Sequence, residues 1–471
     1  MSTQHPTLTS VPSSLASWLK RNFFSRATCR FVLAGAITFL TVASAVPASA
    51  QAQQQRPNIL FIMGDDIGWF NIGAYHQGIM SSKTPNLDRL ASEGMRFTDY
   101  YAEASCTAGR ANFITGELPI RTGMTTVGQA GADVGLSANG GTGEGVAGAK
   151  YDMTTFDDVL VKDSIDFMKK AKESGKPFFL WHNTTRMHVF TFLAEKYKAM
   201  MNPETNYGLE EAGMAQFDDS VGALLKGLDD LGIADNTIVV FSTDNGAEVF
   251  TWPDGGMTPF RATKGTVYEG GFRVPAIIRW PGKVPAGKVE NGIFSGLDWL
   301  PTFVAAAGDP NIVDELKTGK DLGGTTYKVH LDGYDQTDLL TGKGPSRRHE
   351  IWYFAESNLG GLRLDDFKYR FIDQPEGWPG PKVPVNMPIL ENLKQDPFER
   401  LPVSNVLEGS PAFFNDFYAR EFWRFVYVQQ KVGELAQTAI EFPPMQKGAS
   451  FNLQAVKEQV EAAVARGHPG N

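Results

Sequence analysis

The sequence predicts an α/β protein with a mostly parallel sheet flanked by helices, followed by a smaller C-terminal α+β domain that carries an antiparallel sheet. Short, continuous apolar runs predict strands buried on both faces, and they alternate with amphipathic helical patterns, as in parallel sheets. After about residue 345 the pattern changes to short strands separated by turns, which is typical of an antiparallel meander. We therefore predict a larger domain at 56–345 and a smaller one at 346–471.

Four apolar runs predict the buried strands of the larger domain. The helix at 84–95 has Pro85 near its start and Gly94 near its end, which is the usual placement of both residues. From Met214 to Leu231, apolar residues recur at spacings of three and four, a strong helical signature. The predicted strands are 59–63, 177–181, 237–242 and 276–280, and the predicted helices are 84–95, 106–115, 155–173 and 214–231.

Two other stretches of the larger domain have a distinct pattern. The helix at 155–173 is amphipathic, and a glycine-rich connector at 137–150 has almost no apolar residues and cannot form regular structure on its own. The apolar face of that helix is predicted to bury Phe156, Val159, Leu160, Ile165 and either Phe167 or Met168.

The smaller domain begins with three short strands at 351–354, 361–364 and 369–372. A helical tail rich in Phe and Trp follows at 413–436. Strands first and helices afterwards predict an α+β arrangement rather than a continuation of the parallel sheet.

The first 50 residues have the order of a secretory signal peptide. Lys20, Arg21, Arg26 and Arg30 precede an apolar run at 31–46, and the small residues of 48–50 form a cleavage pattern. The run is shorter than the ~20 residues that a membrane span needs, although an uncleaved N-terminal anchor is the alternative. We expect an exported protein, periplasmic or extracellular, with no stable membrane span after cleavage.

The net charge of the chain excludes one class of binding partner. The formal net charge is −9, and removal of the basic leader makes the chain more acidic still. Nucleic-acid binding requires basic patches, so no nucleic-acid partner is expected. A hydrophobic content of 42% indicates a folded chain with a sizeable core.

The sequence has two cysteines, and only one of them would remain after removal of the leader. Cys29 lies in the leader, so the exported chain would keep Cys106 alone and could form no internal disulfide. A single thiol in an oxidising compartment is a liability unless it is used or modified. The other interpretation is a small buried apolar residue.

Two predicted strands end in pairs of oxygen ligands: Asp65-Asp66 after the first, and Asp244-Asn245 after the third. In open α/β sheets, ligands bind at the carboxyl ends of the strands. Either pair alone could be an ordinary turn or helix cap. Two pairs at equivalent strand ends favour a site for a hard cation, Ca²⁺ or Mg²⁺.

A third motif identifies a family. Residues 105–110 read Ser-Cys-Thr-Ala-Gly-Arg and are followed by Thr115-Gly116; this Cys-x-Ala-x-Arg pattern resembles the signature of type I sulfatases, in the alkaline-phosphatase-like superfamily. The flanking motifs agree with it. They are Arg56 to Asp66, Thr84 to Ala91, Thr243 to Gly246, Lys264 to Pro275 and Asp396 to Glu399.

The resemblance implies a modified nucleophile. In this family a maturation enzyme oxidises the motif cysteine, here Cys106, to formylglycine, which would answer the question of the lone thiol. Hydration of the aldehyde gives a geminal diol. One hydroxyl attacks sulfur and expels the alcohol, and the other then collapses and releases sulfate. The implied activity is hydrolysis of sulfate esters of small molecules or carbohydrates.

The resemblance also implies the other site residues. Asp65, Asp66, Asp244 and Asn245 would hold the metal together with the modified Cys106, and Arg110 would help to activate the nucleophile. Lys264 would bind the sulfate and His188 would protonate the leaving group. Taken alone, Lys264 could be a solvated surface charge and His188 a loop histidine satisfied by hydrogen bonds.

One family segment is missing. Sulfatases of this type carry a second Lys–His pair in a Gly-Lys-x-His-Leu-Gly strand, which would fall in the connector at 137–150. No histidine lies there, and nothing in the spacing shows that His76 or His182 replaces it. Each lost electrostatic contact typically costs roughly 10²–10³ in rate.

Three functions remain open on the sequence. The leading hypothesis is a metal-dependent sulfuric ester hydrolase of arylsulfatase type. A degenerate member that binds sulfate esters with little turnover is the second, and the missing segment favours it. A phosphonate or phosphate monoester hydrolase of the same superfamily is the third, because some phosphonate hydrolases share the formylglycine.

Overall fold

The computed structural model describes residues 56–127, 152–250, 257–400 and 411–450. The predicted leader at 1–50 and connector at 137–150 lie outside these ranges, and both stay predictions. The described residues all belong to one unit of the chain, 54–471. The predicted domain boundary near 345 falls just before the second sheet and stays a prediction.

The main sheet has six strands in the order β4-β1-β5-β6-β2-β7. Strand β6 runs antiparallel to both of its neighbours, and the remaining pairs are parallel. The predicted mostly parallel sheet is therefore confirmed. The strands are β1 (Asn58–Gly64), β2 (Met95–Phe97), β4 (Phe179–Asn183), β5 (Thr237–Thr243), β6 (Ala276–Arg279) and β7 (Lys288–Glu290).

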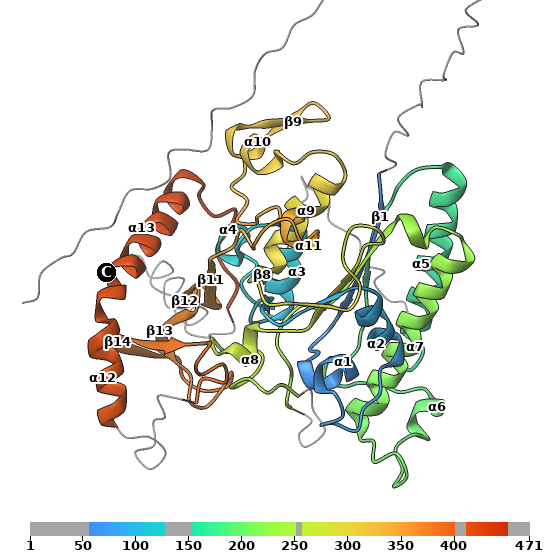
Figure 1. Cartoon of the computed structure of the whole chain (residues 1–471), viewed down its shortest axis with the longest axis horizontal. Coiled ribbons are helices and arrows are strands. Elements are labelled where there is room, and N and C mark those ends of the chain that lie inside the picture. Colours follow the sequence, from blue (N-terminus) through green and yellow to red (C-terminus); the bar gives the residue numbers. More distant parts are fainter. Residues whose placement is uncertain (1–55, 128–151, 251–256, 401–410, 451–471) are drawn as a thin grey trace, which may run out of the picture. The chain divides into compact units, whose positions relative to one another are not determined.

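Helices cover both faces of this sheet (Figure 1). Side chains alternate between the faces along β1, so Leu60 and Ile62 point to one side and Phe61 to the other. The first side packs against α2 (Pro85–Glu93), α5 (Phe156–Ser174) and α7 (Leu209–Asp230), and the second against α3 (Cys106–Thr115) and α9 (Trp299–Ala306). Each fully buried large apolar side chain contributes about 1.5–3 kcal/mol.

Two predictions of burial were partly wrong. Strand β4 is the outermost strand of the described sheet, and Phe179 is 43% exposed although the sequence predicts a buried strand. On α5 the predicted alternative Met168 is buried and Ile165 packs against the core, but Val159 is exposed and Val161, which was not predicted, is buried. The apolar pattern gives the helix period, but the packing of α5 against α7 decides which of two adjacent apolar stripes is covered.

The second sheet is antiparallel, as predicted, in the order β11-β12-β13-β14. Strand β14 was not predicted, because it contains two prolines and mostly half-exposed residues. Helices occupy the predicted tail. The elements are β11 (Glu350–Ala355), β12 (Asn358–Leu364), β13 (Phe367–Asp373), β14 (Val383–Asn392), α12 (Pro411–Glu421), η4 (Phe422–Arg424) and α13 (Phe425–Glu441).

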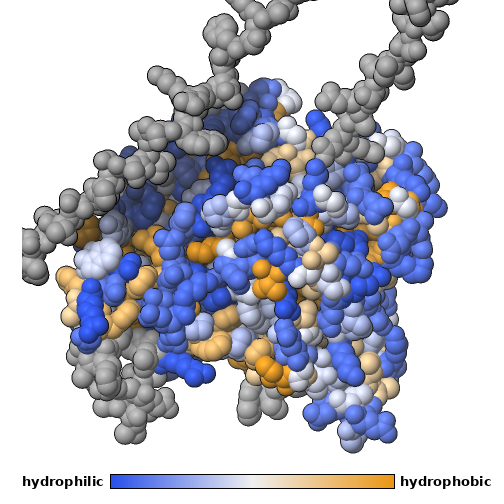
Figure 2. All heavy atoms as spheres, in the orientation of Figure 1, coloured by the Kyte–Doolittle hydropathy of each residue, from blue (hydrophilic) through white to orange (hydrophobic). Residues whose placement is uncertain are grey.

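Short elements complete the described chain. Hydrophilic residues dominate the face shown in Figure 2, with small, separated apolar patches. Among the described helices, none has the length and apolar character to cross a membrane. The short elements are η1 (Trp69–Asn71), α1 (Gly73–His76), β3 (Tyr100–Tyr101), α4 (Pro119–Thr122), α6 (Glu195–Lys198), η2 (Ala234–Asn236), α8 (Glu269–Phe272), β8 (Phe294–Ser295), η3 (Gly296–Asp298), α10 (Ile312–Thr318), β9 (Lys320–Leu322), β10 (Thr325–Tyr327) and α11 (Thr337–Leu340).

Buried charges join the two sheets in what we call the junction cluster: Asp99, Glu269, Arg273, Arg363, Lys368 and Glu399. Asp99 lies 2.8 Å from an Arg273 nitrogen and 2.9 Å from an Arg363 nitrogen. Burial alone would raise the pKa of Asp99, but Arg273 and Arg363 outweigh it and lower that pKa. Lys368 Nζ lies 3.1 Å from Glu269 and 2.7 Å from Glu399.

Candidate active site

The two predicted acid and amide pairs lie side by side. Strands β1 and β5 are parallel and in register, so that Gly64 pairs with Thr243. Asp65 and Asp66 follow the first strand, and Asp244 and Asn245 follow the second. The Asn245 Nδ2 donates to Asp66 Oδ1 at 2.7 Å, and the Asp66 backbone N–H donates to Asp244 Oδ1 at 3.4 Å.

Helix α3 brings Cys106 to the same edge of the sheet. Cys106 is the first residue of the helix, and its Sγ lies 3.3 Å from Asp65 Oδ1 and 3.9 Å from Asp66 Oδ1. The helix can approach this closely because residue 109 is glycine. A Cβ at that position would lie 1.7 Å from the Asp244 carbonyl oxygen, which excludes every other residue without movement of the backbone.

The Arg110 side chain forms hydrogen bonds to residues at the ends of three strands, β1, β4 and β5. Its Nε donates to Asp244 Oδ2 at 2.8 Å, and its Nη2 donates to Asp65 Oδ2 at 3.0 Å. Its Nη1 donates to Asn183 Oδ1 at 2.6 Å, at the end of β4. The guanidinium fork therefore fixes both carboxylates relative to the helix that carries Cys106.

Lys264 enters from the loop that follows β5. Its Nζ lies 2.7 and 2.9 Å from the two oxygens of Asp66, and the residue is buried. The loop is fastened on both sides, since the Lys264 N–H donates to Ala247 O at 3.0 Å and the Gly265 N–H donates to Ala104 O at 2.7 Å. Lys264 is thus part of the site and not a solvated surface charge.

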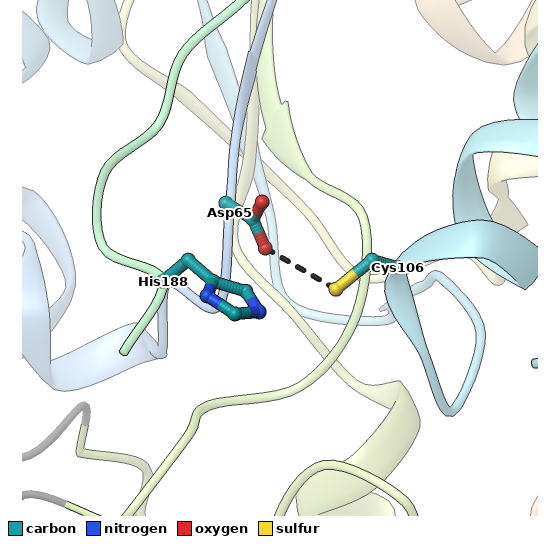
Figure 3. A group of neighbouring side chains, drawn as sticks. All are labelled: Asp65, Cys106 and His188. Atoms are coloured by element: carbon teal, nitrogen blue, oxygen red, sulfur yellow. Dashed lines mark hydrogen bonds between the residues drawn. The ribbon is translucent and has the colours of Figure 1, made fainter. Parts of the chain in front are cut away.

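His188 reaches the site from the loop after β4. The Asp65 N–H donates to Arg186 O at 2.9 Å and the Met187 N–H donates to Asp65 O at 2.5 Å, which holds this loop against the end of β1. Figure 3 shows the imidazole beside Asp65 and facing Cys106. The potential ligand atoms of these three residues lie within 4.8 Å of one another.

The site holds more negative charge than its own cations compensate. Burial, followed by the charges of Asp244 and Asp66, raises the pKa of Asp65 to about 8. Burial also raises the pKa of Asp244, despite Arg110. Burial works against the charged form of Lys264, but Asp66 outweighs it and raises the Lys264 pKa. Asp65 and Asp244 therefore resist ionisation until a further cation is present.

This donor set fits a hard divalent cation. Ligand atoms of Asp65, Asp66, Asp244 and Cys106 lie within 4.8 Å of one another. The buried Asn245 Oδ1 has no hydrogen-bond donor among the described residues, so it is free to bind a metal. Four of these five residues offer oxygen, which suits Ca²⁺ or Mg²⁺ better than softer metals.

The Cys106 thiol is the least suitable of these five side chains as a ligand for a hard cation. Burial and then the charges of Asp244 and Asp65 raise the pKa of Cys106, so the sulfur stays protonated at neutral pH. A protonated thiol is a weak nucleophile and a weak ligand for a hard cation. An oxygen-bearing side chain at position 106 would fit these surroundings better.

Sequence reasoning missed Asn183, which accepts the hydrogen bond from Arg110. The rule that selected the acid pairs could have found it, because Asn183 ends a strand and pairs in register with Met63. The two histidines considered as replacements do not join the site. His182 Nδ1 lies 2.8 Å from Ser164 Oγ on α5, and His76 Nε2 lies 3.0 Å from Ser82 O.

Carboxylates at the ends of parallel strands, with Cys106 at the N-terminus of α3 beside them, form an arrangement suited to hydrolysis assisted by a metal ion. The sequence profile of the Sulfatase family matches residues 57–144 and 136–309. The chain belongs to the type I sulfatase family, and its membership supports the activity of a sulfuric ester hydrolase.

Individual relatives agree with this assignment. N-acetylgalactosamine-6-sulfatase of Canis lupus familiaris is 27% identical over 464 positions, covering 78% of this chain and 85% of the relative. Arylsulfatase A of Homo sapiens is 30% identical over 412 positions, covering 69% of this chain and 77% of the relative. The PsFucS1 sulfatase from Pseudoalteromonas sp. has a similar structure, with a TM-score of 0.69, 25% identity, and coverage of 84% of this chain and 92% of that chain.

The comparisons also show where this chain is shorter. The alignment with the canine relative has 464 positions but covers only 78% of the 471 residues here, so the relative has segments without a counterpart. The family profile matches in two pieces that meet at 136–144. That region overlaps the predicted connector, where the Lys–His segment would fall.

Proposed function

We propose that this chain hydrolyses sulfate monoesters with a formylglycine formed from Cys106 and a bound Ca²⁺ or Mg²⁺. The observation that carries the proposal is the convergence of Asp65, Asp66, Asp244 and Cys106 within 4.8 Å. Family membership supports the reaction, and the geometry supports the particular residues. We assign the metal ligands to Asp65, Asp66, Asp244, Asn245 and residue 106.

The residues of the chain have distinct roles in this proposal. A hard cation would withdraw charge from a sulfate oxygen, and the hydrated aldehyde at position 106 would supply the attacking hydroxyl. Arg110 holds Asp65 and Asp244 in place and stabilises negative charge at the nucleophile. Lys264 binds a second sulfate oxygen, at the position where charge develops in the transition state.

His188 acts on the leaving group. Its Nδ1 lies 3.1 Å from the Val189 carbonyl oxygen, which requires a proton on Nδ1; His188 therefore acts as an acid in its doubly protonated form, with the transferred proton on Nε2. Transfer of that proton to the ester oxygen releases a neutral alcohol. Water then hydrates the aldehyde at position 106 again, so that one sulfate monoester and one water give one alcohol, one sulfate dianion and one proton.

Maturation and location are part of the proposal. A formylglycine-generating enzyme would act on Cys106 before the chain folds, because the residue is buried afterwards. The leader at 1–50 supports export to the periplasm or outside the cell. The substrate would be a sulfate ester of a small molecule or a carbohydrate. One similar structure is titled as a complex with a neocarrahexaose and another as a complex with D-glucosamine-2-N,6-O-disulfate.

The missing Lys–His segment predicts slow chemistry. One cation and one imidazole that orient the nucleophile are absent from the motif pattern, and neither His76 nor His182 replaces them. Two preorganised contacts at a few kcal/mol each suggest a deficit of about 3–6 kcal/mol, a rate loss of roughly 10²–10⁴. The deficit should be larger for alkyl sulfates than for activated aryl sulfates, because an acidic phenol departs with less help.

The same observation supports a second candidate, a degenerate sulfatase that binds sulfate esters with little turnover. The two candidates differ in kcat and not in binding. Restoration of the family segment in place of 137–150 should raise kcat more than it changes KM if the lost contacts act mainly in the transition state. Native turnover of alkyl sulfates at the rate of ordinary sulfatases would contradict the deficit.

The test starts with co-expression of the chain with a formylglycine-generating enzyme. Peptide mass spectrometry should show position 106 as formylglycine, and the metal-loaded protein should release sulfate from 4-nitrophenyl sulfate. The same assay with phenyl phosphonate and phosphate esters tests the third function that the sequence left open. A fully converted, metal-loaded protein that prefers a phosphonate ester would overturn the sulfatase assignment.

A further inference from the structure

An aromatic pair, Phe250 and Trp378, lies near Lys264. The rings of Phe250 and Trp378 are stacked, with centroids 5.7 Å apart and planes 13° from parallel. Lys264 Nζ lies 5.9 Å from the centroid of the Trp378 ring. The pair comes from two distant parts of the chain, the loop after β5 and the turn between β13 and β14.

Trp378 is held rigidly in this position. Gly265 has a φ of +79°, and a Cβ there would lie 2.2 Å from the Trp378 Cγ, so the indole packs directly on the backbone beside Lys264. Gln374 fastens the Trp378 turn to the same loop: its Nε2 donates to Gly265 O at 3.1 Å, and its Oε1 accepts from the Val267 N–H at 3.0 Å. The position of the indole is therefore fixed relative to the site.

Hydrogen bonds hold the backbone of Phe250 in place, whereas its ring is exposed to solvent. The buried Glu248 Oε1 accepts from the N–H groups of Val249 and Phe250, at 2.7 and 2.8 Å. The side chain of Phe250 is nevertheless 58% exposed. A rigid, exposed ring stacked on a second ring presents a flat apolar surface, which is the usual way in which proteins bind the face of another ring.

The pair lies close to Lys264, the residue to which the proposed function gives a sulfate oxygen. Cys106 Sγ is 3.9 Å from Asp66, Asp66 is 2.7 Å from Lys264, and Lys264 is next to Trp378. If Lys264 binds a sulfate oxygen, as in the proposed function on which this inference rests, a substituent on the sulfate has the aromatic pair within reach. An uncharged acyclic group would gain little from it.

We propose that Phe250 and Trp378 form a subsite that binds the ring of the leaving alcohol by stacking. The ligand class is a sulfate ester whose alcohol has a flat apolar ring face, either a phenol or a pyranose. The sulfate group itself contributes nothing to this contact, so the subsite changes affinity for ring-bearing esters and leaves inorganic sulfate unaffected.

The test uses the matured, metal-loaded enzyme and three variants of Phe250. Phe250→Ala should raise KM for 4-nitrophenyl sulfate and for a pyranose 6-sulfate roughly 3- to 12-fold, with little change in kcat. Phe250→Tyr keeps the ring and should stay close to the wild type. Phe250→Leu keeps apolar bulk without a flat face and should resemble the alanine variant. The inhibition constant of inorganic sulfate should not move in any of them.

Controls separate the subsite from general effects. Phe422 is also 58% exposed but lies in η4, so Phe422→Ala should leave every constant unchanged. Trp378 is not substituted, because its loss would free the Gly265 backbone and shift Lys264. An effect on the phenol ester alone, or on the sugar ester alone, would support the subsite and identify its ring.

Two outcomes would overturn the subsite: Phe250→Leu retaining the wild-type KM, or Phe250→Ala weakening inorganic sulfate as much as the ring esters. The proposed function can fail separately. If the wild type turns over no sulfate ester, calorimetry still compares the Kd of 4-nitrophenyl sulfate with that of inorganic sulfate. Equal Kd values, or no binding of either ligand, would then reject the subsite as well.

Discussion

Two buried groups of charges in this chain have different balances, because the junction cluster is neutral and the candidate active site has an excess of acids. In the junction cluster, Asp99 contacts Arg273 and Arg363, and Lys368 contacts two glutamates. In the candidate active site, the three carboxylates of Asp65, Asp66 and Asp244 share only Arg110 and Lys264. In the first group, Arg363 and Lys368 come from the second sheet and the other members from α8 and connecting segments. In the second group, the acids follow strands of the main sheet, Arg110 lies on α3 and Lys264 lies in a loop.

The pKa shifts follow this difference. Arg273 and Arg363 lower the pKa of Asp99 against the effect of burial, whereas burial and neighbouring acids raise the pKa of Asp65 to about 8. Glu399 is intermediate, because burial raises its pKa to about 7 although Lys368 opposes the shift. The junction cluster, whose charges neutralise one another, holds the structure together. The candidate active site has excess negative charge, which favours the binding of a cation.

The largest effect should follow removal of the nucleophile. Cys106→Ala should lower the rate of sulfate ester hydrolysis by at least roughly 10⁴-fold, because no other group at the site can form the covalent intermediate. Its melting temperature should stay near that of the wild type, since a small side chain in the site carries little packing energy. Assays of purified, metal-loaded protein with matched circular dichroism melts check both statements. Full activity in the variant would refute the assignment of Cys106.

Neutralising one acid in each cluster should change stability in opposite directions. Asp99→Asn removes the nearest countercharge of the buried Arg273 and Arg363 and should lower the free energy of unfolding by about 3–5 kcal/mol. Asp65→Asn removes repulsion in the active site and, in excess chelator, should leave that free energy unchanged or raise it. Urea denaturation of both variants in chelator gives the comparison. A loss of stability in Asp65→Asn as large as that in Asp99→Asn would remove the distinction between the clusters.

A buried base without a countercharge extends the comparison. Burial lowers the pKa of His182 from 6.5 to about 4, and its Nε2 has no hydrogen-bond partner among the described residues. The unfolded chain therefore takes up this proton first, so stability falls as the pH falls from about 6.5 to about 4. The expected loss is about 3 kcal/mol. Urea denaturation at pH 7 and pH 4.5 should show a smaller pH dependence in His182→Asn than in the wild type.

Metal binding should have the smallest of these effects on stability, and only the active-site cluster should respond to it. Ca²⁺ or Mg²⁺ at about 100 times its Kd should stabilise the protein by about 2.7 kcal/mol, and chelation should reverse the gain. Zn²⁺ should not replace either ion, because the ligands are hard oxygens. Thermal melts with each ion test this for the wild type and for Asp244→Asn, which should lose the response. An unchanged melt of verified metal-free protein on addition of either ion would count against the site.

Much of the site could be predicted from local pattern. Asp65, Asp66, Asp244 and Asn245 follow apolar runs, and the carboxyl ends of parallel strands meet at one edge of a sheet. Cys106 and Arg110 lie one helical turn apart, so a helix that places the first at the site also directs the second toward it. Asn183 was not predicted as a site residue because it lies on an edge strand, and the apolar run of that strand ends before the amide.

The sequence by itself determined β1, β4, β5 and β6, the long helices and the residues that form the acid-rich edge, because continuous apolar runs, a helical period of 3.6 and a dense motif are local properties of the chain. Only the tertiary structure decided which face of α5 is buried, that β4 lies at the edge of the described sheet, and that Phe250 stacks on Trp378. These features depend on which distant segment lies against each surface. A repeating pattern shows that a surface is apolar, but the neighbour that covers it is chosen by the packing of the whole fold.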